Sequence, residues 1–411
     1  VELMNIYIED YKKDTLINID ELNTSVLSFK KLYDGKLTFG DIDIEGLLLN
    51  IKTYHGEADT NLDVFVAKFD DDKPRDGKSD FLLSSSDVSI VDSEFRISDE
   101  NKETVEILKF NNLNINATDF VIHGPDVNAR INKLSFLDKR GLQLENMSTN
   151  FGYKLTGMTF DDLKIKTQSS ALNGQLAFDY NREDLQHFED SVRVTAKFSE
   201  SVVMLDELNL FYNEFGKDQT VELDTELSGT LNHLHTTNLV LKAPGRTIVR
   251  GDIIFQNLFN KEEDNFEMDA DFRELSSTYY DLRRLLPNVL GKSLPSSLEK
   301  LGKFTITGNS RVTSQRVIAD LDINTQLGMV YSDLQLSEID DIDNARYEGT
   351  MIMDEFEIGK FIDDPKVGTV SLNLEVEGKG FTLDKIDTFI EGSVYGLFYN
   401  DYYYSGIAVS G

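Results

Sequence analysis

The chain has 411 residues, no cysteine and a formal net charge of −32, from 41 basic and 73 acidic side chains. A surface this acidic repels the phosphates of nucleic acids and of anionic head groups, so we expect neither nucleic-acid binding nor charge-driven adsorption to a membrane. Without cysteine there are no disulfides, thiolate metal ligands or cysteine nucleophiles. No apolar run reaches the ~18 residues that a membrane-spanning helix needs.

Residues 1–110 alternate apolar and polar positions less regularly than the rest of the chain. We expect them to form the N-terminal part of an extended β-sheet. The polar stretch at residues 69–79, which contains Pro74 and the three aspartates Asp70, Asp71 and Asp72, predicts a solvated loop.

Residues 111–190 alternate more strictly, which predicts β-hairpins with one apolar and one polar face. Leu163 and Ile165 are separated and followed by lysines, and the same spacing resumes after a polar turn. The apolar positions of the returning strand are Leu172, Gly174, Leu176, Phe178 and Tyr180.

Residues 191–411 repeat one order of elements three times: a strand, a short amphipathic helix, a second strand with a glycine, and a long hairpin. The glycines Gly229, Gly308 and Gly378 mark equivalent steps, about 70 to 80 residues apart. A unit that cannot close its own apolar face must stack on its neighbours. The repeat therefore predicts an elongated all-β structure.

Three segments of these repeats predict short helices, because their apolar residues have helical spacing. They are residues 201–215, a segment capped by Ser276 or Ser277 that ends near Pro287, and residues 356–363. Each is too short to be stable alone, so we expect each to pack on the sheet or on its rim.

The last hairpin predicts its own register, because Asn400 and Asp401 suit a two-residue turn. The expected cross-strand pairs, all on one face, are Phe398 with Tyr403, Val394 with Ile407, and Gly392 with Val409.

Sites for chemistry are not apparent in the sequence. No nucleophile elbow, phosphate-binding loop or dinucleotide fingerprint occurs, so we expect neither an enzyme nor a cofactor. His233 and His235 share one face of an extended segment but lack a third ligand nearby, which favours surface histidines over a metal site. Asp340, Asp341 and Asp343 lack the glycine and the distal glutamate of a calcium loop and predict a solvated turn.

Several runs resemble the periplasmic part of the AsmA-like family, in particular its TamB-like branch. They are residues 227–234, 238–242, 285–287 leading to 301–308, and 368–374 followed by 378–381. The resemblance covers most of the chain from about Leu113 onward and rests on the order of the repeats rather than on a catalytic signature. Residues 1–110 depart from it most.

The resemblance implies a β-taco, a sheet curled into a half-pipe with a hydrophobic groove and short helices at its rim. It implies a bridge-like protein in the periplasm of Gram-negative bacteria that carries phospholipid between the inner and outer membranes. The alternative is a scaffold for outer-membrane protein assembly that works with an Omp85-type (TamA-like) barrel or another assembly component. Family members are anchored in the inner membrane by an N-terminal helix that this sequence lacks, and we expect the chain to be a fragment of a longer protein.

Acyl chains give the groove a physical rationale. Moving a two-chain lipid into water costs on the order of 20 kcal/mol, which a continuous apolar trough would largely remove. Alternating strands also suit a closed core, so the pattern leaves both possibilities open. The candidate groove residues are Leu176, Phe178, Leu239, Leu241, Val249, Ile253, Phe255, Leu321, Ile323, Leu334, Leu336, Val394, Phe398 and Ile407.

Overall fold

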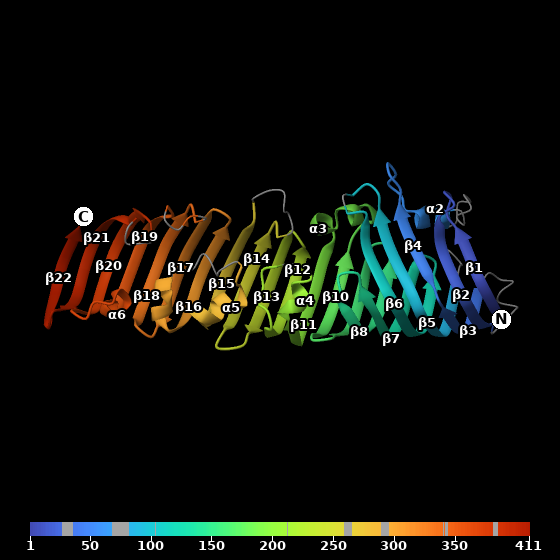
Figure 1. Cartoon of the computed structure of the whole chain (residues 1–411), viewed down its shortest axis with the longest axis horizontal. Helices are drawn as coiled ribbons and strands as arrows, with labels where there is room; N and C mark the ends of the chain where they lie inside the picture. Colours follow the sequence, from blue (N-terminus) through green and yellow to red (C-terminus); the bar gives the residue numbers. More distant parts are fainter. Residues whose placement is uncertain are drawn as a thin grey trace. The chain divides into compact units, whose positions relative to one another are not determined.

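The computed structural model describes residues 1–26, 36–67, 82–102, 104–211, 213–258, 265–288, 296–339, 341, 344–380 and 385–411. Within them, strands account for 69% of the residues and helices for 10%, which confirms the all-β class. The chain divides into two compact units, Val1–Glu183 and Asp184–Gly411, shown from blue to green and from green to red in Figure 1. The loop predicted at residues 69–79 lies outside the described residues, as do Asp340 and Asp343.

The first unit is a sheet whose neighbouring strands are antiparallel, including β2 with β3 and β4, apart from the pairing of β3 and β4 with β5. These two lie end to end along β5 and pair with it in parallel. The predicted boundary near residue 110 falls inside β6. The described elements are β1 (Glu2–Glu9), β2 (Thr15–Val26), β3 (Lys36–Glu45), β4 (Leu48–Thr53), α2 (Asn61–Ala67), β5 (Leu82–Asp99), β6 (Glu106–His123), β7 (Asp126–Asp138), β8 (Gln143–Lys154), β9 (Gly157–Thr167) and β10 (Ala171–Asp179).

The second unit contains the order strand, short helix, strand and hairpin three times, and each of its strands pairs antiparallel with the next. Residues Arg182–His187 (η1) and Phe188–Ser191 (α3) precede the first repeat. That repeat is β11 (Arg193–Met204), α4 (Leu205–Leu208), β12 (Thr220–Thr230), β13 (His233–Lys242) and β14 (Ile248–Gln256). The second is β15 (Glu267–Thr278), α5 (Tyr279–Leu285), η2 (Ser296–Leu301), β16 (Lys303–Thr313), β17 (Arg316–Thr325) and β18 (Gly328–Ser337). The third is β19 (Arg346–Phe356), α6 (Ile358–Ile362), β20 (Val367–Lys379), β21 (Asp387–Tyr399) and β22 (Tyr402–Ser410).

The helices differ from their predicted extents for local reasons. The helix predicted at residues 201–215 is wrong over its first four residues, because β11 continues to Met204 and Val203 pairs with Val221 of β12. Among the described residues of this stretch, only Leu205–Leu208 is helical. The cap of α5 is Thr278, whose hydroxyl accepts a hydrogen bond from the Asp281 N–H at 3.1 Å. The predicted cap residues Ser276 and Ser277 are buried in β15.

The register of the last hairpin is confirmed. Phe398 pairs with Tyr403, and Tyr399 and Tyr402 close the two-residue turn. Asn400 and Asp401 have φ values of 50° and 66°, the left-handed region that a type I′ turn requires at both central positions.

The three glycines of the repeats do not occupy equivalent positions, contrary to the prediction. Gly229 and Gly378 lie one residue before the ends of β12 and β20, whereas Gly308 lies in the middle of β16. At Gly308, with φ of 120°, a Cβ atom would meet the Asp320 carbonyl oxygen at 2.3 Å. Close approach of the next strand therefore explains this glycine better than a step in the repeat does.

Candidate functional site

One side of the second unit is apolar across eleven strands. In β17, Val317, Ala319, Leu321 and Ile323 are buried or half-buried, and the residues between them point to the other side of the sheet. Each of these apolar residues pairs with an uncharged residue on the same side of the neighbouring strand. The apolar residues of β12–β22 therefore form continuous rows.

Four such rows, which we call the apolar face, run across the strands. The first is Leu223, Leu241, Val249, Leu275, Ile306, Ile323, Val330, Met353, Leu372, Val394 and Ile407. The second is Leu239, Gly251, Phe272, Gly308, Leu321, Ser332, Met351, Leu374, Gly392 and Val409. The third is Leu227, Thr236, Ile253, Ala270, Ser310, Ala319, Leu334, Gly349, Val376 and Ile390. The fourth is Gly229, Leu234, Phe255, Met268, Val312, Val317, Leu336, Tyr347, Gly378 and Thr388.

Every residue of the four rows is uncharged, although more than a quarter of the chain is charged. The two middle rows also carry smaller side chains than the first row. From β14 to β19 each strand places no more than one large side chain in these two rows, as with Phe272 beside Ala270 or Leu334 beside Ser332. The second and third rows of the apolar face therefore have less side-chain volume than the first row.

Short helices cover one margin of this face. Leu301 of η2 and Ile358 and Phe361 of α6 pack against a buried cluster that includes Phe356 and Val394. The helices α4, α5 and α6 lie along one rim of the second unit (Figure 1). With four to seven residues each, they are too short to cover all four rows.

Hydrogen bonds link these rim elements from one repeat to the next. The Gly216 N–H, after α4, donates to the Leu285 carbonyl of α5 at 2.9 Å. Lys300 of η2 donates to the Phe361 carbonyl at 2.8 Å and pairs with Asp363 at 2.5 Å, next to α6. The rim therefore connects the three repeats separately from the strand pairing.

The opposite side of the second unit carries the charge. Its ion pairs cross neighbouring strands, as between Arg250 and Glu274 at 3.2 Å and between Arg311 and Asp269 at 2.6 Å. A hydrogen bond to Asp269 raises the pKa of Arg311, and a hydrogen bond from Lys197 lowers the pKa of Glu226. These solvated pairs contribute little stability each, but they make this side incompatible with an apolar ligand.

Most of the predicted groove residues of the second unit lie on the apolar face. Leu241, Val249, Ile323, Val394 and Ile407 are in its first row, Leu239 and Leu321 in the second, Ile253 and Leu334 in the third, and Phe255 and Leu336 in the fourth. Leu239 and Ile253 are buried in one cluster with Ala270.

Phe398 is the exception. Ser371 pairs with Gly396 and Leu372 with Val394, so Tyr395 is an extra residue in β21. This bulge reverses the side to which later residues point. Leu397 packs into the Val394 cluster instead, and Phe398 is 41% exposed, so its predicted place on the same face is wrong.

Leu176 and Phe178 lie in the first unit, on a comparable uncharged side. The row of Leu176 continues through Phe160, Phe151 and Ala129, and Phe178 pairs with Met158. Phenylalanine rings pack along this side, with 5.2 Å between the ring centroids of Phe151 and Phe160 and 6.2 Å between those of Phe160 and Phe178. Each unit thus has its own apolar side.

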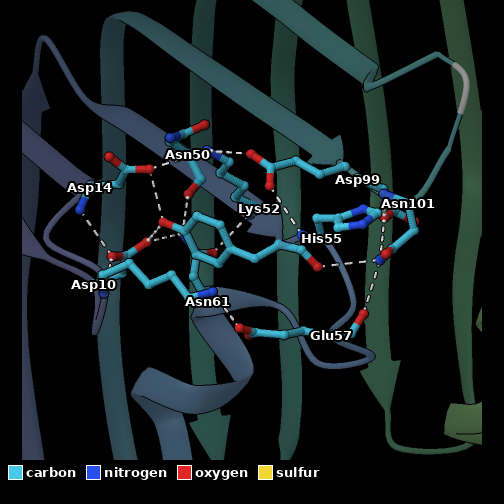
Figure 2. A network of polar contacts seen from close by, with 12 residues as sticks. Asp10, Asp14, Asn50, Lys52, His55, Glu57, Asn61, Asp99 and Asn101 are labelled. Carbon is cyan, nitrogen blue, oxygen red and sulfur yellow. Dashed lines mark hydrogen bonds and ion pairs between the residues drawn. The ribbon is translucent and has the colours of Figure 1, made fainter.

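A buried polar network in the first unit was not predicted (Figure 2). The Asp10 carboxylate accepts hydrogen bonds from Tyr54 Oη at 2.6 Å, from Asn61 Nδ2 at 3.0 Å, and from the N–H groups of Lys12 and Asp14. Burial alone would raise the pKa of Asp10, but these hydrogen bonds hold it below its usual value.

Tyr54 lies at the centre of this network. Lys12 and Lys52 lie 4.3 and 4.6 Å from its ring centroid. Burial, with hydrogen bonds to Asp10 and Asp14, raises its pKa. The groups of the network hydrogen-bond one another, so we interpret it as joining the β1–β2 turn to β4 and α2 rather than as a catalytic site. The side-chain hydrogen bonds of Asp10 and Asp14 to Tyr54 and Asn61 join residues 40 to 51 apart in sequence, so no local pattern signals them.

Two further features of the described part of the chain concern metal clusters and membrane-spanning helices. No group of three or more histidine, cysteine, aspartate or glutamate side chains that could hold a metal ion occurs there. Among the same residues, no helix is long and apolar enough to cross a membrane. Comparison of the chain with protein-family models, curated proteins and solved structures finds no match.

Proposed function

We propose that the apolar face carries the acyl chains of phospholipids, and that the chain is part of a bridge for lipid between the inner and outer membranes of a Gram-negative bacterium. The observation that carries the proposal is the separation of charge. Four rows on one side of the second unit contain no charged residue, and cross-strand ion pairs such as Arg250–Glu274 and Arg311–Asp269 lie on the other side.

The energetics favour acyl chains as the ligand. Each methylene moved from water to an apolar surface gains about 0.8 kcal/mol, so a face that extends over many strands can offset the cost of exposing a whole chain. Hydrocarbon needs contact and no hydrogen bond, and the rows provide leucine, isoleucine, valine, methionine and phenylalanine with few hydroxyl groups. In the middle rows of β14–β19 at least one of the two side chains of each strand is glycine, alanine or serine, which leaves room for a chain to lie across the strands.

The periplasmic location, the inner-membrane anchor and an outer-membrane partner of the Omp85 type come from the resemblance to the AsmA-like family, and they are part of the same proposal. The role of scaffold for outer-membrane proteins would use strand edges rather than the apolar face. The two roles therefore respond differently to a charge placed on that face.

The test compares Leu334→Arg with Asp333→Arg, neighbours in β18 that lie on opposite sides of the sheet. Each variant is purified from a Gram-negative host, and phospholipid is measured by native mass spectrometry and by extraction. We expect phospholipid with the wild-type chain and with Asp333→Arg, and a severalfold loss with Leu334→Arg, because a charge on the acyl path costs several kcal/mol. Equal lipid in both variants at equal thermal stability would contradict the proposal and favour the scaffold.

A further inference from the structure

Two histidines on the charged side of the second unit lie unusually close together. His233 and His235 are at the start of β13, and Leu234 between them belongs to the fourth row of the apolar face, so both imidazoles point to the opposite side. Their Nε2 atoms form a hydrogen bond with each other at 3.1 Å, with ring centroids 4.9 Å apart and planes at 69°.

This distance matches the separation of two ligands on a single transition metal ion. Imidazole nitrogens bind such ions at about 2.0–2.1 Å, so two neighbouring ligands are about 2.9 Å apart at a right angle and about 3.4 Å apart at a tetrahedral angle. The observed 3.1 Å falls between these limits. A bound ion would replace the hydrogen bond between the two imidazoles, with both Nε2 lone pairs turned towards the ion.

The neighbouring strands hold the pair in place. His235 pairs with Ser228 of β12 and Ile254 of β14, and the His233 N–H donates to Thr230 Oγ1 at 3.1 Å. A chelate whose backbone is fixed loses less conformational entropy on binding than a flexible pair does. The sequence shows that the two histidines are two residues apart on a strand, and the structure shows that their Nε2 atoms are 3.1 Å apart.

The electrostatic setting also favours a cation. The same side of β12, β14 and β15 carries Asp224, Glu226, Asp252 and Glu267, and the whole chain has a formal charge of −32. Such a surface raises the local concentration of divalent cations. Three of these carboxylates are already in ion pairs: Glu226 with Lys197 at 2.9 Å, Asp252 with Arg273 at 3.1 Å and Glu267 with Arg311 at 3.3 Å. The carboxylates therefore act here through the net negative charge of the chain and not as ligands.

We propose that His233 and His235 together chelate one divalent transition cation of the imidazole-binding class, Cu²⁺, Ni²⁺ or Zn²⁺, through their Nε2 atoms. Water completes the coordination, since no group of three or more potential ligands occurs among the described residues. With two protein ligands the site is open and exchangeable, unlike a structural four-ligand zinc site. Imidazole ligands exclude Mg²⁺ and Ca²⁺, which prefer oxygen.

The experiment titrates the purified chain with CuCl₂, NiCl₂, ZnCl₂ and MgCl₂ by isothermal titration calorimetry. We expect one Cu²⁺ per chain at this site, tighter than Ni²⁺ and Zn²⁺, with no heat from Mg²⁺. His233→Gln and His235→Gln should each weaken Cu²⁺ binding by about tenfold or more, because either change leaves a single imidazole. The control is His123→Gln, an exposed histidine of the first unit, which should bind like the wild type.

Electron paramagnetic resonance of the Cu²⁺ complex supplies the second readout, since nitrogen couplings count the bound imidazoles. Two imidazoles in the wild type and one in each single variant would support the chelate. Unchanged affinity in either variant, or a single imidazole in the wild type, would overturn it. Circular dichroism melts in chelator establish that the variants remain folded, so a loss of metal cannot be assigned to unfolding.

Discussion

The buried carboxylate of Asp10 makes a sharp prediction for the stability of the first unit. Asp10 is 7% exposed and accepts four hydrogen bonds, two of them from the buried side chains of Tyr54 and Asn61. In Asp10→Ala the Asn61 side chain loses one of its two acceptors, at a cost of about 1–3 kcal/mol. Tyr54 Oη keeps Asp14 as an acceptor at 2.9 Å, and the backbone donors of the turn can reach water. We therefore expect the first unit to lose about 1–3 kcal/mol of its free energy of unfolding.

The same carboxylate makes this stability depend on pH. The pKa of Asp10 is lower in the folded chain than its usual value. Its ionised form therefore stabilises the fold above the unfolded pKa, which is near 3.9, and that contribution disappears as the pH falls through the folded pKa. Asp10→Asn, which cannot titrate, should differ most from the wild type at neutral pH and less at pH 3.

Hydrogen exchange with mass spectrometry is the appropriate assay, because it reports β1–β4 separately from the second unit. The matched control is Asp14→Ala, which removes a half-exposed carboxylate that pairs with Lys52 at 3.1 Å and accepts a hydrogen bond from Tyr54 Oη at 2.9 Å. Tyr54 keeps Asp10 as its acceptor, so this change should cost about 1 kcal/mol or less. A loss of less than about 1 kcal/mol in the free energy of unfolding of Asp10→Ala would refute the reasoning. So would a difference in free energy of unfolding between the wild type and Asp10→Asn that does not become smaller at acidic pH.

Two further predictions concern residues with positive φ. Gly308→Ala should destabilise the second unit by about 2 kcal/mol or more, because its Cβ would overlap the Asp320 carbonyl oxygen, and Gly141→Ala, also at positive φ but in open space, should cost less. Denaturant unfolding of the two variants checks the difference, and equal losses would contradict the close approach. Asp401→Gly should stabilise the last hairpin by about 0.5–1 kcal/mol, because φ of 66° suits glycine. Slower hydrogen exchange in β21 and β22 is the expected result, and faster exchange would count against the type I′ turn.

Period-two alternation was sufficient to predict the strands of the second unit. Together with the turn residues, it also predicted the register of the last hairpin. The pairs around Asn400 and Asp401 follow from a face that must stay apolar and a turn that accepts positive φ. Prediction failed where two periods fit one sequence: residues 201–204 suit a helix and a strand alike, and pairing with β12 decides between them.

The candidate site was predictable in part for related reasons. Alternation placed Leu321 and Leu334 on one face, but Phe398 depends on an extra residue, Tyr395, that no propensity signals. The Asp10–Tyr54 network joins residues 44 apart in sequence through tertiary contacts, so no local pattern precedes it. The spacing of His233 and His235 was visible, whereas the 3.1 Å between their nitrogens was not.

Site-specific photocrosslinking to phospholipid tests the central claim most directly, because it reads contact at one residue without adding a charge. A benzophenone side chain is introduced at Leu321 or Leu334 on the apolar face, or at Asp322 or Asp333 on the charged side of the same strands. We predict phospholipid adducts from Leu321 and Leu334 and none above background from Asp322 and Asp333. Adducts of equal yield from both sides, or from neither, would contradict an acyl-chain path along the apolar face.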